Sequence, residues 1–404
     1  MTMTLSPLAR QVMAGMVGAA GGLLASNLIT NKQDVTYQEP PASSAVAKSS
    51  LPPRASKILA FGHPQATVPS PMVYRNHVLE YDSVRRVPRW VAEHLTKEQV
   101  KQEVANRKGV NFSPDPIVPL QFTSTNKDYW GSGWSRGHMA PAGNNKHCQD
   151  SMNDTFYLTN VVPQDLDNNG GYWNRLEIWV RGLTDQYQDV WVVSGPLWLP
   201  NQEEIKINDA SNNEKVTSGA GDVNDSKVKD KRGVKPPRPV KTVSYPVLGP
   251  NNVAVPTHLY KVVLVTDPLL DKPLLGTFVV PNIPVGDKHL AEFKVDIEVV
   301  EKGVGVTFHP DLDRDSVGDL CIKSGCNLQD YKQFQQFFWT RRLRSPRNMF
   351  FLEKDWEEAK TKGVVNAQLE QVYMESKSKL EIKEAVQDKN IINVDKTAVV
   401  APAA

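Results

Sequence analysis

The chain has few cysteines and almost no net charge. Its 404 residues contain only Cys148, Cys321 and Cys326, and an odd number in so long a chain argues against a disulfide framework. No second Cys or His pair accompanies Cys321 and Cys326, so a zinc site is not expected. A formal net charge of +2 does not indicate a whole-chain nucleic-acid binder. Any basic surface therefore has to be local.

The sequence also lacks internal repeats and the glycine-rich motifs that bind nucleotide phosphates. Its length is enough for about two or three domains by the usual size of a domain. A hydrophobic content of 40% is sufficient for a large core. These features favour a soluble enzyme or binding protein whose function lies in a local constellation of residues.

The first 33 residues lack acidic side chains and include an apolar run at 12–29. A run of that length is at the lower limit for crossing a bilayer. We therefore predict that residues 1–34 are a mitochondrial targeting segment that also serves as a membrane anchor. A cleaved secretory signal is the alternative, and the scarcity of cysteine disfavours it. Residues 35–56 are rich in Pro, Ser and Ala, which predicts a disordered linker.

The rest of the chain divides into regions with different sequence patterns. Between 57 and 300, β-rich runs such as VWVVSG and LYKVVLV alternate with turn clusters, which predicts a globular domain. Within it, 200–241 has no aromatic residue and is expected to be a disordered insertion. Residues 301–365 have a helical pattern, which predicts a small C-terminal helical domain. A charged tail, 366–404, follows.

The stretch WSRGHMAPAGNNK, from 134 to 146, places His138 between two cationic residues, Arg136 and Lys146. A cationic neighbourhood favours the neutral form of histidine, which can accept a proton. The pattern is therefore typical of a base placed beside an anion. A histidine that is simply satisfied in a glycine-rich turn is the alternative, and this stretch alone does not decide between them.

A second polar set follows within about forty residues. The apolar run from Thr155 to Val162 ends at Pro163 and predicts a strand that contains Asn160. A turn with Asn169 leads into a helix, because apolar residues recur at helical spacing. The predicted buried stripe is Trp173, Leu176, Val180 and Leu183, and the opposite face carries Asn174, Glu177 and Arg181. Taken alone, Glu177 and Arg181 could be a surface ion pair of little energetic value.

Taken together, SRGH, Asn169 and Glu177 resemble the motif of the DNA/RNA non-specific endonuclease family. The resemblance extends from about residue 61 to about 365, without 200–241, and is nearest to the branch of EXOG-type mitochondrial exo/endonucleases, related to endonuclease G. It implies an α+β fold: a ββα-metal nuclease core on a mixed or antiparallel sheet with flanking helices, and a small C-terminal helical domain.

The resemblance also implies a role for each matching residue. His138 corresponds to the general base, Asn169 to the direct metal ligand, and Glu177 to the residue that holds metal-bound water. Asn160 corresponds to the supporting asparagine, and Arg136 and Arg181 to the two active-site arginines. The implied cofactor is Mg²⁺, which Mn²⁺ can replace. Most family members have Asp where this chain has Ser135, which puts in doubt how freely the enzyme cuts inside strands.

The function implied is hydrolysis of phosphodiester bonds without sequence specificity, leaving 5′-phosphates. Resemblance to the EXOG branch suggests a 5′-to-3′ exonuclease with endonuclease activity in mitochondrial DNA maintenance and repair. It also suggests a homodimer in the inner-membrane or intermembrane region that acts on DNA, with RNA or RNA/DNA hybrids as further substrates. Lys146, Phe334 and Arg341 are the implied contacts that favour DNA ends. The alternatives are an endonuclease G-like enzyme without end preference and an inactive, membrane-tethered DNA-binding scaffold.

Overall fold

The computed structural model describes residues 54, 57, 66, 68–200 and 241–397, with only the backbone for 384–397. The described fold belongs to the second of two units of the chain, which spans Gln65–Ala404. The predicted targeting segment, nearly all of the linker and most of the predicted insertion lie outside the described residues. Within the described part, no helix has the length and apolar character needed to cross a membrane.

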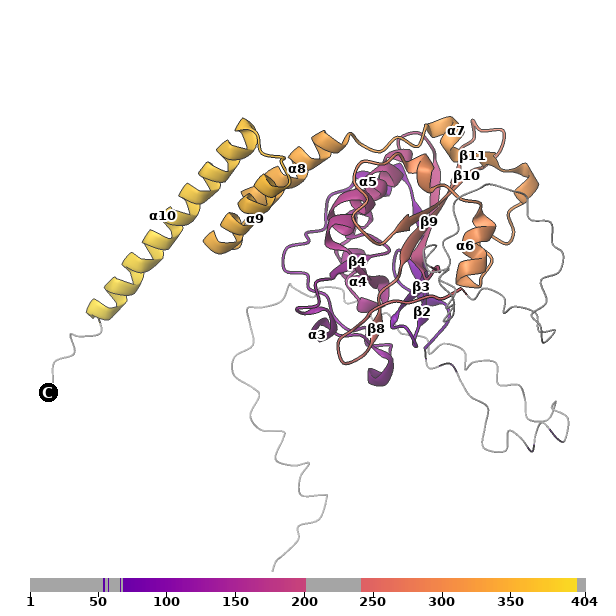
Figure 1. Ribbon diagram of the computed structural model, residues 1–404, viewed down its shortest axis with the longest axis horizontal. Coiled ribbons are helices and arrows are strands. Elements are labelled where there is room, and N and C mark those ends of the chain that lie inside the picture. Colours follow the sequence, from indigo (N-terminus) through magenta and orange to yellow (C-terminus); the bar gives the residue numbers. More distant parts are fainter. Residues whose placement is uncertain (1–53, 55–56, 58–65, 67, 201–240, 398–404) are drawn as a thin grey trace, which may run out of the picture. The chain divides into compact units, whose positions relative to one another are not determined.

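A seven-stranded sheet organises the fold (Figure 1). Its strands, in spatial order, are β1 (Met72–Val73), β2 (Val78–Asp82), β3 (Val87–Leu95), β6 (Asp189–Leu197), β9 (His258–Thr266), β10 (Leu274–Pro281) and β11 (Gly318–Asp319). Neighbouring strands are antiparallel except β10 and β11, which are parallel. The two runs predicted as strands form β6 and β9, and the predicted α+β class with a mixed sheet is confirmed.

The two faces of the sheet pack against different helices. Alternate residues of a strand point to opposite faces, so β9 contributes Leu259 and Val263 to one core and Tyr260 and Val262 to the other. The second core is covered by α6 (Ile297–Val304). The left-handed backbone of Gly305, with φ of 78°, ends that helix, and glycine adopts such a φ without strain.

The first face is covered by a β–β–α unit. Strands β4 (Ser135–His138) and β5 (Val161–Gln164) form an antiparallel pair, and α5 (Asn174–Leu183) follows. The predicted stripe is confirmed, because Trp173, Leu176, Val180 and Leu183 are all buried in this core. The remaining short elements on this side are α2 (Lys97–Lys101), α3 (Asn126–Tyr129), α4 (Gln149–Asp154) and the hairpin β7 (Val247–Leu248) with β8 (Val253–Ala254).

One local prediction was wrong. Asn160 does not lie in a strand but ends a 3-10 turn, Leu158–Asn160, whereas Pro163 lies inside β5. The apolar run was ambiguous because a short buried run has the same composition in a turn and in a strand. Among the cysteines, Cys321 and Cys326 form one local disulfide at α7 (Leu320–Ser324), which the sequence did not predict and which is not a disulfide framework, and Cys148 is free.

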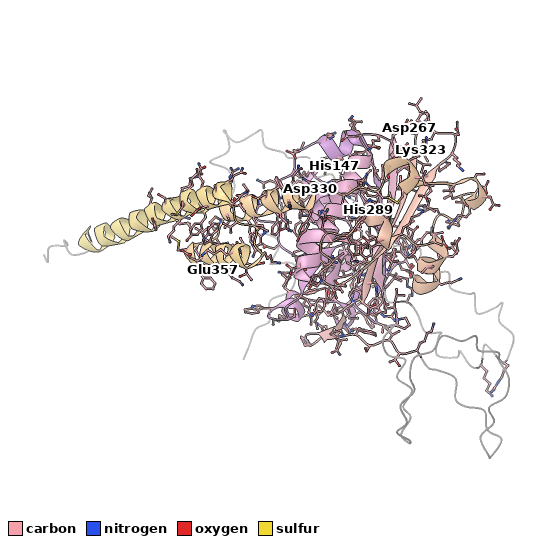
Figure 2. All side chains as sticks on the ribbon, turned by 45° about the horizontal axis from the view of Figure 1, so that its top comes forward. His147, Asp267, His289, Lys323, Asp330 and Glu357 are labelled. Atoms are coloured by element: carbon pink, nitrogen blue, oxygen red, sulfur yellow. A yellow bond between two sulfur atoms is a disulfide. The ribbon has the colours of Figure 1, made fainter. Side chains whose placement is uncertain are left out.

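The C-terminal part contains α8 (Tyr331–Arg344), α9 (Met349–Thr361) and α10 (Ala367–Thr397). Asp330, labelled in Figure 2, caps α8 by accepting a hydrogen bond from the backbone N–H of Gln333 at 2.9 Å. The three helices share a small core of Trp339, Leu343, Leu352, Trp356, Ala359, Leu369, Val372 and Tyr373. Helix α10 begins in the stretch for which the sequence predicted a charged tail.

Candidate active site

The β4–β5 pair presents Arg136 and His138 on the same face of β4, because they are two residues apart. Gly137, between them, faces the other way and lies against Gln164. A Cβ atom at Gly137 would come within 2.0 Å of Gln164 Oε1, so only glycine allows the two strands this close approach. The glycine of the SRGH motif is therefore required by the packing of the strands.

His138 lies between two aromatic rings. The centroids of Phe112 and Phe156 are each 4.9 Å from the imidazole centroid. Its Nε2 is buried and has no hydrogen-bond partner among the described residues. Burial lowers the pKa of His138 to about 3, and the positive charges of Arg107 and Arg136 act in the same direction. The imidazole is thus neutral at pH 7, with a ring nitrogen free to accept a proton.

Asn160 fixes the backbone that follows His138. Its Oδ1 accepts a hydrogen bond from the Ala140 N–H, and its Nδ2 donates to the carbonyls of Ala140 and Thr155, all at 2.9 Å. The Asn160 carbonyl accepts a further bond from the Met139 N–H. The side chain of Asn160 is buried and its polar groups bond within the protein, so it holds the backbone on both sides of the turn in place.

Asn169 lies in a π-helical turn, Asn168–Trp173, that leads directly into α5. Its neighbour Asn168 is buried and anchors the turn by donating to the carbonyls of Pro281 and Ile283 at 3.0 Å. Asn169 Nδ2 donates to Ser135 Oγ at 3.0 Å, and Ser135 Oγ donates to the Gln164 carbonyl. This chain of bonds orients the amide of Asn169 and leaves its Oδ1 available as an oxygen ligand.

Glu177 and Arg181 on α5 are half-buried, so they are not a fully solvated surface pair. Burial raises the pKa of Glu177, opposed first by the charge of Lys261 and then by that of Arg181. Arg181 Nη1 donates to Asn144 Oδ1 at 3.1 Å. Burial also lowers the pKa of Arg181, opposed by Glu177 and Glu93. The site thus keeps ionisable groups out of water, which is typical of functional sites.

Sequence reasoning missed a charged layer beneath these residues. Glu93 and Lys261 come from β3 and β9, and their side chains are 5% and 1% exposed. Lys261 Nζ donates to Ser194 Oγ at 2.6 Å and lies 4.7 Å from the centroid of the Trp173 ring. Burial raises the pKa of Glu93 to about 8, opposed first by Lys261. A lysine inside the apolar run LYKVVLV was the signal that could have revealed this layer.

Arg107 was also missed. It lies 5.4 Å from the centroid of the Phe156 ring, which itself contacts His138. Burial lowers the pKa of Arg107, and Arg341 on α8 adds to the effect. Arg341 is exposed, and its effect on the pKa of Arg107 indicates that its charge acts near the site. Nothing in the spacing of the motif pointed to Arg107, which precedes it by about thirty residues.

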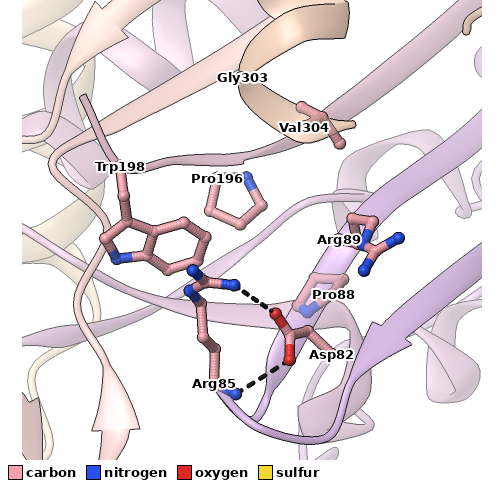
Figure 3. Close-up of a pocket in the computed structure, with 8 residues that line it drawn as sticks. All are labelled: Asp82, Arg85, Pro88, Arg89, Pro196, Trp198, Gly303 and Val304. Atoms are coloured by element: carbon pink, nitrogen blue, oxygen red, sulfur yellow. Dashed lines mark hydrogen bonds and ion pairs between the residues drawn. The ribbon is translucent and has the colours of Figure 1, made fainter. Parts of the chain in front are cut away.

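Lys146 and Phe334, the other two predicted DNA contacts, are occupied by interactions within the protein. Lys146 forms an ion pair with Glu103 at 2.6 Å. The side chain of Phe334 is 1% exposed, so its ring has no free face for a base to stack on, whereas Phe337 on the same helix is 58% exposed. A small hollow of about 120 Å³, at Arg85 and Trp198, contains none of the predicted site residues (Figure 3).

The donor set decides which metal the site could hold. The described residues include no cluster of three or more His, Cys, Asp or Glu side chains of the kind that binds a metal. The available donors are instead the amide oxygen of Asn169 and, from α5, the carboxylate of Glu177. Oxygen donors in small number fit Mg²⁺, because Mg²⁺ retains several waters and substrate oxygens. The residues present therefore fit a hard divalent cation that is held largely by water and phosphate.

Comparison with known proteins agrees with this site. The family model described as DNA/RNA non-specific endonuclease matches residues 54–315. The chain is 44% identical to "Nuclease EXOG, mitochondrial" of Danio rerio, over 80% of this chain and 84% of the relative. It is 41% identical to the protein of that name from Homo sapiens, over 89% and 86%. "Nuclease 1, mitochondrial" of Schizosaccharomyces pombe is 33% identical, over 69% and 78%.

Among solved structures, a chain of the crystal structure of the EndoG/EndoGI complex matches with a TM-score of 0.51 and 34% identity. The match covers 66% of this chain and 95% of that one. The chain therefore belongs to the DNA/RNA non-specific endonuclease family, whose members are metal-dependent. It is a nuclease that hydrolyses phosphodiester bonds, and its curated relatives include mitochondrial nucleases.

Proposed function

We propose that this nuclease cleaves with His138 as general base, Asn169 as ligand of one Mg²⁺ ion and Glu177 as support for the water around that ion. The observation that carries the proposal is the neutral, half-buried imidazole of His138, whose Nε2 has no hydrogen-bond partner among the described residues and lies near the positive charges of Arg107 and Arg136. A group kept neutral by cations is suited to accept a proton beside an anionic substrate.

Each residue then has a chemical task. His138 takes the proton of the attacking water at Nε2. Arg136 and Arg181 face the negative charge that builds up on the phosphate, an effect that is stronger away from water. An incoming phosphate raises the pKa of His138 again, because its negative charge favours the imidazolium. When bound, Mg²⁺ supplies a positive charge that stabilises the leaving oxygen. If the leaving oxygen is the 3′ oxygen, the bond between it and phosphorus breaks, and the product has a 5′-phosphate.

The substrate preference is a second part of the proposal. Since the arginines bind phosphate and not bases, sequence specificity is weak. We propose a 5′-to-3′ exonuclease with additional endonuclease activity on DNA, with RNA and RNA/DNA hybrids as further substrates. Exposed Arg341, whose charge reaches Arg107, supports a role for α8 in positioning DNA. Lys146 is a weaker candidate because Glu103 already neutralises it.

The names of the relatives support a mitochondrial location. Anchoring by residues 1–34 in the inner membrane, facing the intermembrane space, is the arrangement we propose, with a homodimer as the working assembly and mitochondrial DNA repair as the role. A fluorescent fusion of the full chain should enter mitochondria, and one without residues 1–56 should remain diffuse. Secretion of the full-length fusion would contradict the proposed location.

Digestion of linear and circular duplex DNA in Mg²⁺ tests the reaction. The proposal expects linear DNA to be degraded from its ends, with slower nicking of the circle. Equal attack on both would favour the endonuclease G-like alternative. Absence of cleavage, with DNA binding retained, would favour an inactive scaffold. The variant Asn169→Ala, run alongside, should need more Mg²⁺ for the same rate, and an unchanged Mg²⁺ titration would exclude the ligand role.

A further inference from the structure

Three side chains from separate elements form a continuous hydrogen-bonded chain under the site. Glu93 on β3 accepts from Asn144 Nδ2 through both carboxylate oxygens, at 3.1 and 3.2 Å. Asn144 belongs to the short 3-10 turn Ala142–Asn144 that follows His138, and its Oδ1 accepts from Arg181 Nη1 at 3.1 Å. The chain therefore joins the central sheet, the loop after the proposed base and helix α5.

This chain determines which way the Asn144 amide points. Above its pKa of about 8, the Glu93 carboxylate can only accept hydrogen bonds, so it requires the NH₂ group of Asn144 on its side, and the guanidinium of Arg181, which only donates, requires the amide oxygen. The amide oxygen must then face Arg181, where it can accept from the guanidinium. With an uncharged hydrogen-bonding partner at position 93, the amide could also take the flipped orientation, which would place its NH₂ group against a cation.

The turn also confines Arg181 by contact. A Cβ atom at Gly143 would lie 3.0 Å from Arg181 Nη1, so the guanidinium packs directly against the backbone of this turn. Asn144 and Glu93 are 3% and 5% exposed, and water therefore does not replace their bonds. Lys261, also buried, supplies a positive charge near Glu93 and Glu177. In this layer, burial shifts the pKa of Glu93, Glu177, Arg181 and Lys261 toward the neutral form of each group, and the neighbouring groups of opposite charge oppose that shift.

We propose that Glu93 and Asn144 are positioning residues: the Glu93 carboxylate fixes the Asn144 amide, which holds the Arg181 guanidinium in one place relative to His138. The inference rests on the proposed role of Arg181 at the phosphate. It gives a function to the first asparagine of the AGNN sequence behind the SRGH motif. Asn145, next to it, instead donates to the Pro141 carbonyl at 3.2 Å and so fixes the turn itself.

An exchange of the two groups tests this chain. In Glu93→Gln, assayed at a pH above the Glu93 pKa of about 8, the carboxylate that fixes the amide is lost. We expect kcat on a duplex oligonucleotide to fall roughly 10-fold there, as for loss of a charge-assisted hydrogen bond. Asn144→Asp should lose more, because it sets two carboxylates side by side. The double variant Glu93→Gln with Asn144→Asp restores one donor and one acceptor in reversed order. It should recover to within about threefold of wild type by the same reasoning.

Several measurements keep the result interpretable. Thermal denaturation and DNA binding in EDTA, followed by fluorescence anisotropy, are measured for every variant, and Thr277→Val serves as a matched buried control in the same sheet. Thr277 Oγ1 has no hydrogen-bond partner among the described residues, so this control should match wild type in kcat. If a charged variant does not fold, Asn144→Ser removes the amide without adding charge and should show the roughly 10-fold loss.

Two outcomes would overturn the positioning role. One is a folded Glu93→Gln enzyme, or a folded Asn144→Ser enzyme, with wild-type kcat. The other is a double variant no more active than Asn144→Asp alone, since a purely structural defect is not repaired by exchanging the two groups. Arg181→Met separates this inference from the proposed function. Full activity of Arg181→Met would reject the role of Arg181 itself, whereas its loss beside an active Glu93→Gln would reject only the positioning chain.

Discussion

Helices α5 and α8 both combine aromatic residues with arginines and both bury apolar side chains, but their charged side chains lie in different surroundings. On α5, Glu177 and Arg181 are half-buried, and loss of water shifts the pKa of each toward its neutral form. On α8, Phe334 and Trp339 are buried and Arg341 is exposed. Arg342 is neutralised by Asp355 and Glu358 at 2.7 and 3.1 Å.

The difference indicates that the aromatic residues of α8 serve packing, whereas the charged residues of α5 serve the reaction. Burying an aromatic side chain is favourable, so the pattern on α8 needs no function to explain it. Removing a charge from water is costly unless the charge is paired, so the charged side chains of α5 reduce stability. Their presence therefore indicates a functional role. Variants of the two regions should consequently fail in different ways: those around α5 in rate, and those of α8 in stability.

The largest effect is expected at the proposed base. His138→Ala should lower the cleavage rate by roughly 10²- to 10⁴-fold, because a general base contributes about that much, with nearly unchanged DNA affinity. Single-turnover cleavage of a labelled duplex and anisotropy measure the two quantities. The fold should persist by circular dichroism. A rate near that of wild type would remove His138 from the mechanism and with it the contrast between the helices.

A matched pair on α8 tests the other half of the comparison. Phe334→Ala removes a buried ring and should lower the free energy of unfolding by about 3–5 kcal/mol. Phe337→Ala, on the exposed side of the same helix, should change it by less than about 0.5 kcal/mol. Chemical denaturation gives both values. If Phe334→Ala instead left stability unchanged and abolished attack on DNA ends, the ring would be a DNA contact and not a core residue.

Acid should weaken the core through its buried histidines. Burial lowers the pKa of His77 to about 3, as it does for His138, while an unfolded histidine titrates near 6.5. Between these values the unfolded chain binds more protons than the native one. Stability therefore falls as pH falls from about 6.5 to about 3, by up to about 1.4 kcal/mol per pH unit for each histidine.

Replacement of His77 isolates that contribution. His77 stacks on Tyr74 with ring centroids 4.4 Å apart and is 2% exposed, so His77→Phe keeps a flat ring in the same place. The variant should lose part of the pH dependence measured by denaturant titration at several pH values. A slope identical to that of wild type would show that His77 does not titrate in this range.

The sequence predicted the apolar stripe of α5 and the motif residues, but not the charged layer beneath the site or the burial of Phe334 on α8. The stripe of α5 was predicted because apolar residues at helical spacing have one favourable arrangement, and SRGH with Asn169 and Glu177 led to the family. Asn144, Glu93 and Lys261 were not predicted, because their significance depends on contacts between β3, β9 and the turn after His138. Burial of Phe334 likewise depends on packing, since its spacing to the next aromatics fits a core stripe and an exposed platform equally well.

The smallest effect concerns Ser135, the position at which this chain departs from the usual motif. Ser135 Oγ accepts from Asn169 Nδ2 at 3.0 Å and donates to the Gln164 carbonyl at 2.7 Å, so it orients the amide without contributing charge. Ser135→Ala removes both neutral hydrogen bonds, and the one that orients Asn169 is worth about 0.5–1.5 kcal/mol. The Mg²⁺ concentration for half-maximal cleavage should therefore rise by roughly 2- to 10-fold.

Ser135→Asp provides the complementary change. Its carboxylate can still accept from Asn169 Nδ2, and its negative charge near the proposed metal ligand should lower the Mg²⁺ requirement below that of wild type. Activity on linear and nicked circular DNA across a Mg²⁺ series compares the three proteins. If Ser135→Ala and Ser135→Asp shifted the requirement in the same direction, the hydroxyl would not be acting through the amide of Asn169. In that case Ser135 would act on the position of strand β4 and not on the metal ligand. Its role would then be one of packing, as for the buried aromatic residues of α8.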